Sequence, residues 1–277
     1  MSNGLSGIIR TLHFGGFGRT VTADEIIGGQ NDMEGALKIS VVIPAFNEEK
    51  LIGGTLESVQ KAMGAFRERG WGTELIICDN NSTDGTAALA RAAGATVVFE
   101  PVNQIGRARN RGAEAATGDW LLFVDADSRP TRELLAEVAA AIETGRYLYG
   151  GATVKFDDFH PVWSNGVKIW NAMSRIGKFV AGSFIFCERA AFVKLGGFDN
   201  TIFVGEELEL RNRLKRLARE TGKRAIILHR HPLVTSARKG KLYSMREMLW
   251  FLARSTFRWR RTVTDRDACH AWYDGRR

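Results

Sequence analysis

The sequence predicts an α/β fold, a mostly parallel central sheet with helices on both faces, and two observations support this prediction. Short apolar runs typical of buried strands alternate with helical patterns from residue 38 onward. Such parallel strands are joined by helical crossovers that bury both faces of the sheet. Several runs also end in polar clusters, at the carboxyl edge where sheets of this type bind ligands. We divide the chain into an extension over 1–37, a domain over 38–236 and a tail over 237–277.

Four apolar runs predict the strands of the first half of the domain. These strands cover residues 39–45, 74–78, 95–99 and 120–124. The first intervening helix opens at Asn47-Glu48-Glu49, the second is rich in alanine and ends near Ala93, and the third covers 105–116. Because strand and helix alternate at this spacing, we expect parallel strands with right-handed connections.

Two carboxylates end the fourth strand, in the motif Asp125-Ala126-Asp127. Mg²⁺ and Mn²⁺ take oxygen ligands and keep substrate phosphates in their shell, so one or two carboxylates suffice to hold such an ion against a diphosphate. The motif is therefore a candidate site for a metal-bound nucleotide. The alternative is that both aspartates cap the next helix, because Pro130 and Thr131 are typical of a helix start.

Six segments, taken together in their order along the chain, resemble the motifs of a known family. They are Val41 to Glu49, Cys78 to Gly85, Gly106 to Gly112, Asp125 to Asp127, Gly196 to Asp199 and Gly205 to Leu210. Together they resemble the family 2 glycosyltransferases, inverting enzymes of the GT-A fold that use nucleotide-diphosphate sugars. The resemblance covers about 38–236 and implies a nucleotide-binding half over 38–128 and an acceptor half over 129–236.

The resemblance implies the residues of the donor site. The nucleotide-sugar-binding residues would be Pro44, Ala45, Phe46, Glu48, Asp79, Arg107, Asn110, Asp125 and Ala126. Asp79 is similar to the aspartate that bonds the uracil ring, and Asp125 to one that lies near the ribose. Asp127 would reach the Mg²⁺ or Mn²⁺ ion.

In the acceptor half, the resemblance implies that Gly182, Ser183 and Glu206 bind the acceptor and that Glu207 is the catalytic base. The family usually places Glu-Asp at the head of this helix, whereas this chain has Glu206-Glu207. Two structural roles of Glu207 stay open beside catalysis: a carboxylate stabilised by the positive end of the helix, or an ion pair with Arg211 at the four-residue spacing, at which Glu209 and Arg213 would also pair.

Two further groups of charged or metal-binding side chains are candidates. Arg107, Arg109 and Arg111 suit phosphate recognition, but a helix cannot aim all three at one ligand, so at least one is a structural or solvated charge. His231 is a candidate second metal ligand, with His229 on the same side of an extended segment. Some GT-A enzymes complete their metal site with a histidine from this region; the alternative is a packed histidine.

Composition sets the remaining expectations. The three cysteines, Cys78, Cys187 and Cys269, are far apart, which argues against a disulfide scaffold or a zinc site and fits a reducing compartment. No early apolar run is typical of a signal peptide, and no run approaches the roughly twenty residues that cross a bilayer. We therefore expect a cytoplasmic protein.

The tail contains much of the formal charge of +8 and predicts a basic amphipathic helix. One side would hold Leu242, Met245, Met248, Leu249, Leu252 and Trp259, and another Arg254, Arg258 and Arg261. This pattern is typical of a peripheral membrane contact and would suit a lipid-linked acceptor. The alternative is a helix that packs on the domain. Nucleic-acid binding is not expected, because no recognised module accompanies the charge.

The sequence favours one function among three. A metal-dependent transferase that moves a sugar from a nucleotide-diphosphate sugar, in the first place a UDP-sugar, to a hydroxyl acceptor explains all the motifs. A dinucleotide-dependent oxidoreductase is excluded, because Pro44-Ala45-Phe46-Asn47 stands where its Gly-x-Gly-x-x-Gly turn would be. A nucleotide- or glycan-binding module without turnover stays as the alternative.

Overall fold

The computed structural model describes residues 36–157, 161–238 and 263–265. By its internal contacts the chain divides after Ala36 into two units, and the second, from Leu37 onward, contains the domain discussed below. Nearly all of the predicted extension and of the predicted amphipathic tail lies outside the described residues. Among the helices within these ranges, none has an apolar stretch long enough to cross a bilayer.

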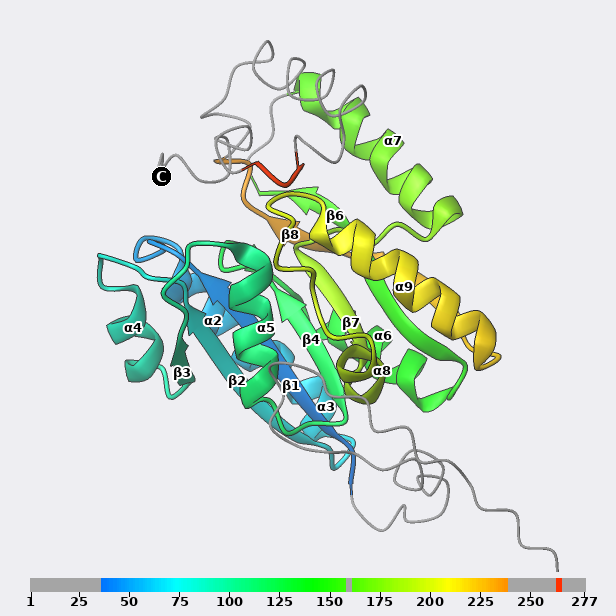
Figure 1. Ribbon diagram of the computed structural model, residues 1–277, viewed down its shortest axis with the longest axis horizontal. Helices are drawn as coiled ribbons and strands as arrows, with labels where there is room; N and C mark the ends of the chain where they lie inside the picture. Colours follow the sequence, from blue (N-terminus) through cyan, green and yellow to red (C-terminus); the bar gives the residue numbers. More distant parts are fainter. Residues whose placement is uncertain (1–35, 158–160, 239–262, 266–277) are drawn as a thin grey trace, which may run out of the picture. The chain divides into compact units, whose positions relative to one another are not determined.

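The described strands form one sheet in the order β3-β2-β1-β4-β7-β6-β8-β5 (Figure 1). They are β1 (Lys38–Ala45), β2 (Gly72–Asp79), β3 (Thr96–Phe99), β4 (Trp120–Val124), β5 (Ser128–Arg129), β6 (Tyr147–Phe156), β7 (Phe184–Glu188) and β8 (Arg224–Thr235). The strands β3, β2, β1 and β4 are parallel, which confirms the prediction for the first half of the domain.

The second half of the sheet departs from the parallel arrangement at β7. This strand is antiparallel to both of its neighbours, β4 and β6, so β6 runs in the same direction as β4. Since β8 is parallel to β6, the carboxyl ends of β1, β2, β4, β6 and β8 all lie at one edge of the sheet, together with the amino end of β7. Loops from both halves of the domain therefore meet at this edge.

Helices cover both faces of the sheet, as the sequence predicts (Figure 1). They are α2 (Ile52–Ala62), α3 (Gly64–Arg67), α4 (Thr86–Ala92), α5 (Ile105–Ala115), α6 (Arg132–Glu143), α7 (Pro161–Gly177), α8 (Arg189–Lys194) and α9 (Glu206–Glu220). One core lies under α2, α3 and α6 and includes Val41 and Ile43, while Val42 points to the other core, under α5, α8 and α9. This alternation follows from the two-residue period of a strand.

The starts of two helices decide points that the sequence raised. Thr131 caps α6, because its hydroxyl accepts a hydrogen bond from Leu134 N at 3.2 Å. The alternative in which Asp125 and Asp127 cap this helix is therefore wrong. The helix predicted to open at 47–49 begins only at Ile52, because Asn47 lies at φ 53° and its side chain accepts a hydrogen bond from Thr83 N at 2.8 Å, which holds the segment as a loop.

Candidate active site

The loops after β1 and β2 are tied together at the carboxyl edge of the sheet. Ala45 and Asp79 end their strands as register partners, and Asn80 N donates to Ala45 O at 2.8 Å. The side chain of Asp79 accepts a hydrogen bond from Ser82 N at 3.0 Å and is nearly buried. The structure thus holds Asp79 beside residues 44–48, as the donor-site assignment requires.

Arg109 is a buried cation that joins the two halves of the domain. Its guanidinium donates to Glu206 Oε1 at 2.6 Å, to Asp125 Oδ1 at 2.9 Å and to the carbonyl oxygen of Gly182 at 2.8 Å, and the residue is only 1% exposed. Three residues that the resemblance assigns to different substrates therefore meet on one guanidinium. Arg109 is the structural member of the alternating arginines, and its central position was not predicted.

Glu207 comes directly after Glu206 in the chain and lies in the first turn of α9. The helix starts after Gly205, whose φ of +85° is a conformation that favours glycine. Glu207 lies beside Gly182, where an added Cβ would be 3.5 Å from the carboxyl carbon of Glu207. Gly182 therefore packs directly beside this carboxylate.

The ion pair considered between Glu207 and Arg211 does not form. The Arg211 guanidinium donates to the carbonyl oxygens of Gly177 and Lys178, the latter at 3.0 Å. The neighbouring pair predicted from the same spacing does form, with Arg213 Nη2 at 2.5 Å from Glu209 Oε2. Glu207 instead lies beside Gly182 and within reach of the charges of Arg109 and Asp125.

Burial among carboxylates raises the pKa of Glu207 to about 8. The largest cause is loss of hydration, the charge of Glu206 adds to it, and the charge of Arg109 opposes it. Asp125, Glu206 and Glu207 share Arg109 as a common cation, so the cluster retains a proton near neutral pH. A carboxylate with a pKa near the working pH is suited to accept a proton during a reaction.

This raised pKa predicts a pH dependence of stability. The pKa of Glu207 is 4.5 without the protein environment and about 8 in the fold, so between these values the folded state binds more protons than the unfolded state. The free energy of unfolding should therefore fall as pH rises across this window. Glu207→Gln should make this fall shallower, which urea unfolding at the two ends of the window measures. Equal pH slopes for the two proteins would contradict the raised pKa.

Asp127 lies in a second cluster, formed with the end of β8. Its carbonyl oxygen accepts a hydrogen bond from Ser236 N at 3.1 Å. Arg238 donates to both carboxylate oxygens of Glu48, at 2.7 and 2.9 Å, and lies 3.8 Å from Asp127 Oδ2. From the sequence, Arg238 counted only as part of the basic tail, so its place in the site was missed. The polar segment directly after the β8 strand was the available signal.

His231 is not brought to Asp127. Its Nδ1 lies 2.6 Å from Glu137 Oε1 on α6, and the five residues of extended chain from His231 to Ser236 span roughly 16 Å. In the ranges that the structure describes, no group of three or more His, Cys, Asp or Glu side chains could hold a metal ion. Asp127 is nevertheless partly exposed, and one carboxylate is enough for an ion that arrives bound to a diphosphate. The donor set therefore fits Mg²⁺ or Mn²⁺ together with a nucleotide.

The other predicted donor-site residues lie in two places, at the carboxyl ends of β1 and β4 and on α5. Pro44, Ala45 and Ala126 are buried where β1 and β4 end, and Phe46 is half-buried. Arg107 donates to Gln104 Oε1 at 3.0 Å and lines a cavity of about 260 Å³ on the outer side of α5. The Asn110 amide donates to Phe198 O and its oxygen accepts from Phe198 N, both at 2.9 Å. Asn110 thus fastens the loop that precedes α9.

Comparison with known proteins agrees with the fold and shows the family. Residues 40–194, more than half of the chain, match the sequence model of glycosyl transferase family 2, and the protein belongs to this family. The glucosyl-3-phosphoglycerate synthase of Mycolicibacterium smegmatis is 39% identical over 97 residues, which cover 32% of this chain and 30% of that protein. The match therefore spans less than a third of that relative's length.

Solved structures share the fold at low sequence identity. The mannosyltransferase PcManGT from Pyrobaculum calidifontis, in complex with GDP-Man and Mn²⁺, has a TM-score of 0.61 at 19% identity and covers 86% of this chain and 65% of that one. Glucosyl-3-phosphoglycerate synthase from Mycobacterium tuberculosis, in complex with Mn²⁺, UDP and glucosyl-3-phosphoglycerate, has a TM-score of 0.56 at 21% identity and covers 79% of each chain. The predicted fold class and family are thus confirmed.

Proposed function

We propose that the protein is a metal-dependent inverting glycosyltransferase that moves a sugar from a UDP-sugar to a hydroxyl acceptor. The observation that carries the proposal is the contact of one buried guanidinium, that of Arg109, with both Asp125 of the donor half and Glu206 of the acceptor half. This contact holds the donor loop beside Glu207, where a sugar and an acceptor hydroxyl would have to meet.

Glu207 is the catalytic base of this proposal. The acceptor oxygen attacks the anomeric carbon, the bond from that carbon to the diphosphate oxygen breaks, and the hydroxyl proton passes to the Glu207 carboxylate. A single displacement of this kind inverts the anomeric centre. The partly buried position of Glu207 in the first turn of α9 and its pKa of about 8 both support the role. Glu206 is tied to Arg109 and acts as a positioning residue.

The donor would lie along the carboxyl ends of β1, β2 and β4. Asp79 would bond the base and Asp125 the ribose. Asp127 would hold Mg²⁺ or Mn²⁺ together with the diphosphate, and this ion supplies neutralisation of the charge that develops on the leaving group. Arg238 lies 3.8 Å from Asp127 Oδ2. Its guanidinium would add a positive charge to that of the ion beside the expected phosphates.

The acceptor would enter from the side of Gly182 and Ser183, in front of Glu207. We propose a hydroxyl group of a lipid-linked or cell-envelope glycan. The complex of the structurally similar synthase with Mn²⁺, UDP and glucosyl-3-phosphoglycerate supports the donor and the ion, whereas the compound on its acceptor side, glucosyl-3-phosphoglycerate, is not a lipid-linked glycan.

Calorimetry of UDP binding with and without Mn²⁺ tests the donor site. Asp127→Asn should lose the Mn²⁺-dependent part of UDP affinity, because one carboxylate is the protein's main ligand for the ion. Asp119→Asn is the matched control: Asp119 precedes the same strand at its other end, where it accepts a hydrogen bond from Lys38 N at 2.8 Å. Equal Mn²⁺ dependence in the two variants would remove Asp127 from the metal site.

A donor-hydrolysis and transfer assay then separates the enzyme from a binding module. Release of UDP from a UDP-sugar, with transfer to a hydroxyl acceptor, is the expected result. Metal-dependent UDP binding without hydrolysis or transfer to any acceptor in a screen would favour the non-catalytic module.

A further inference from the structure

Helix α7 is apolar on two opposite faces. On its inner face Val167 and Trp170 pack against the core that lies under α2, α3 and α6. On the same side the Asn171 amide bonds both backbone groups of Val154, at 3.0 and 2.9 Å. This inner face is enough to hold the helix on β6, so a helix at the protein surface should present polar residues on the other side.

The outer face instead presents Ile169, Met173 and Ile176, which are 61%, 52% and 85% exposed. Their spacing of four and three residues places them in one stripe. Six large apolar side chains are exposed in the described part of the chain, and half of them form this stripe. The other three, Leu89, Phe99 and Val102, lie around β3, which is the outermost strand on the side of the sheet away from β6 and β8. A concentrated apolar stripe of this kind marks an interaction surface.

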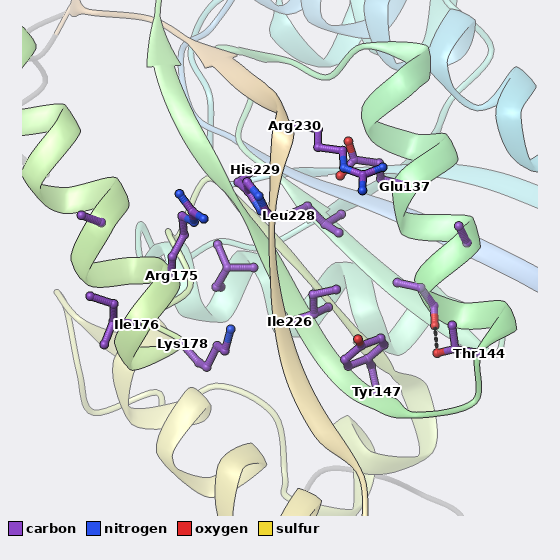
Figure 2. Close-up of a pocket in the computed structure, with 14 residues that line it drawn as sticks. Glu137, Thr144, Tyr147, Arg175, Ile176, Lys178, Ile226, Leu228, His229 and Arg230 are labelled. Carbon is purple, nitrogen blue, oxygen red and sulfur yellow. Dashed lines mark hydrogen bonds between the residues drawn. The ribbon is translucent and has the colours of Figure 1, made fainter.

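Cations border the stripe. Lys168 and Arg175 are exposed on α7, Lys178 follows it, and residues 161–178 contain no Asp or Glu. Beside the stripe, a cavity of about 730 Å³ lies between α6 and α7 over β8. Figure 2 shows Arg175 and Lys178 on the α7 side of this cavity and His229 and Arg230 on β8, with Glu137 as the acidic side chain that is labelled there.

We propose that α7 lies on the surface of an anionic membrane, with Ile169, Met173 and Ile176 at the boundary of headgroups and acyl chains. Apolar residues flanked by Lys and Arg, without carboxylates, are the chemistry of an interfacial helix, and the cations of the cavity face lipid phosphates. A second copy of the chain fits less well, because α7 of one copy would offer no Asp or Glu to pair with the Lys and Arg side chains along α7 of the other.

This placement has a consequence for the active site. α7 ends at Gly177, and Gly182, which bonds Arg109 and lies beside Glu207, follows five residues later. A membrane-bound α7 therefore brings the acceptor side of the crevice close to the lipid surface. The proposed membrane contact of α7 does not itself depend on the proposed sugar transfer.

Co-sedimentation of the full chain with lipid vesicles tests the proposal. The protein should bind vesicles of phosphatidylcholine mixed with phosphatidylglycerol and bind phosphatidylcholine vesicles much more weakly. Replacing Ile169, Met173 and Ile176 together by Ser should weaken binding by at least about tenfold, because the buried apolar area is lost. The double variant Arg175→Gln, Lys178→Gln should weaken binding to the anionic vesicles and leave the weaker binding to phosphatidylcholine vesicles unchanged.

The matched control replaces Leu89, Phe99 and Val102 together by Ser, since these side chains are also exposed but lie at the far edge. It should bind vesicles like the wild type, and the α7 triple variant should keep the wild-type affinity for UDP. Three results would overturn the proposal: no binding of the wild type to anionic vesicles, equal binding of the α7 variant, or a wild-type dimer that the α7 variant converts to a monomer.

Discussion

Glu207→Gln is expected to lower kcat of sugar transfer by about 10²- to 10⁴-fold, the usual contribution of a general base. Glutamine has nearly the same shape but cannot accept the hydroxyl proton. UDP affinity should change little, because the donor residues lie at the ends of β1, β2 and β4. In the wild type, kcat/KM should rise with pH through about 8, where Glu207 loses its proton.

Glu209→Gln is the control for this experiment. Glu209 lies two residues further along α9 and pairs with Arg213. Removing the charge of Glu209 should therefore leave kcat close to that of the wild type. Glu207→Asp should retain part of the activity, because aspartate is the residue that the family usually has here. Near-normal activity of Glu207→Gln would move the base to another residue.

Arg109→Met is expected to destabilise the fold by about 3–5 kcal/mol, the usual cost of removing one partner of a buried ion pair. The side chain of Arg109 is 2% exposed and that of Glu206 is 5% exposed, so Glu206 would be left as a buried charge without its cation. Urea unfolding followed by circular dichroism measures the change. Adding Glu206→Gln to this variant should recover part of the loss, because it removes the unpaired charge.

Arg111→Met is the matched control on the same helix. Arg111 forms an exposed pair with Glu114 at 3.1 Å, and such pairs contribute at most about 1 kcal/mol. If Arg109→Met and Arg111→Met lowered the free energy of unfolding by similar small amounts, the Arg109 cluster would be more hydrated than the structure indicates.

The sequence by itself determined the family, the α/β class and the edge of the sheet to which its polar strand ends come. Apolar runs of strand length and the polar residues that end them are local features, and parallel strands bring their carboxyl ends to one edge. The strand before Asp125 and the helix start at Thr131 were therefore readable one element at a time. So was the pair of Glu209 with Arg213, which depends only on helical spacing.

Only the tertiary structure decided how the site is held together. Arg109 meets Glu206 across 97 residues and Arg238 meets Glu48 across 190, and no periodic pattern carries such pairings. The antiparallel β7 and the length of β8 place these side chains, because they set which loops reach the common edge. They also keep His231 beside Glu137 and away from Asp127. Local spacing fixes which face a residue occupies, but charge pairing in the interior depends on the packing of distant segments.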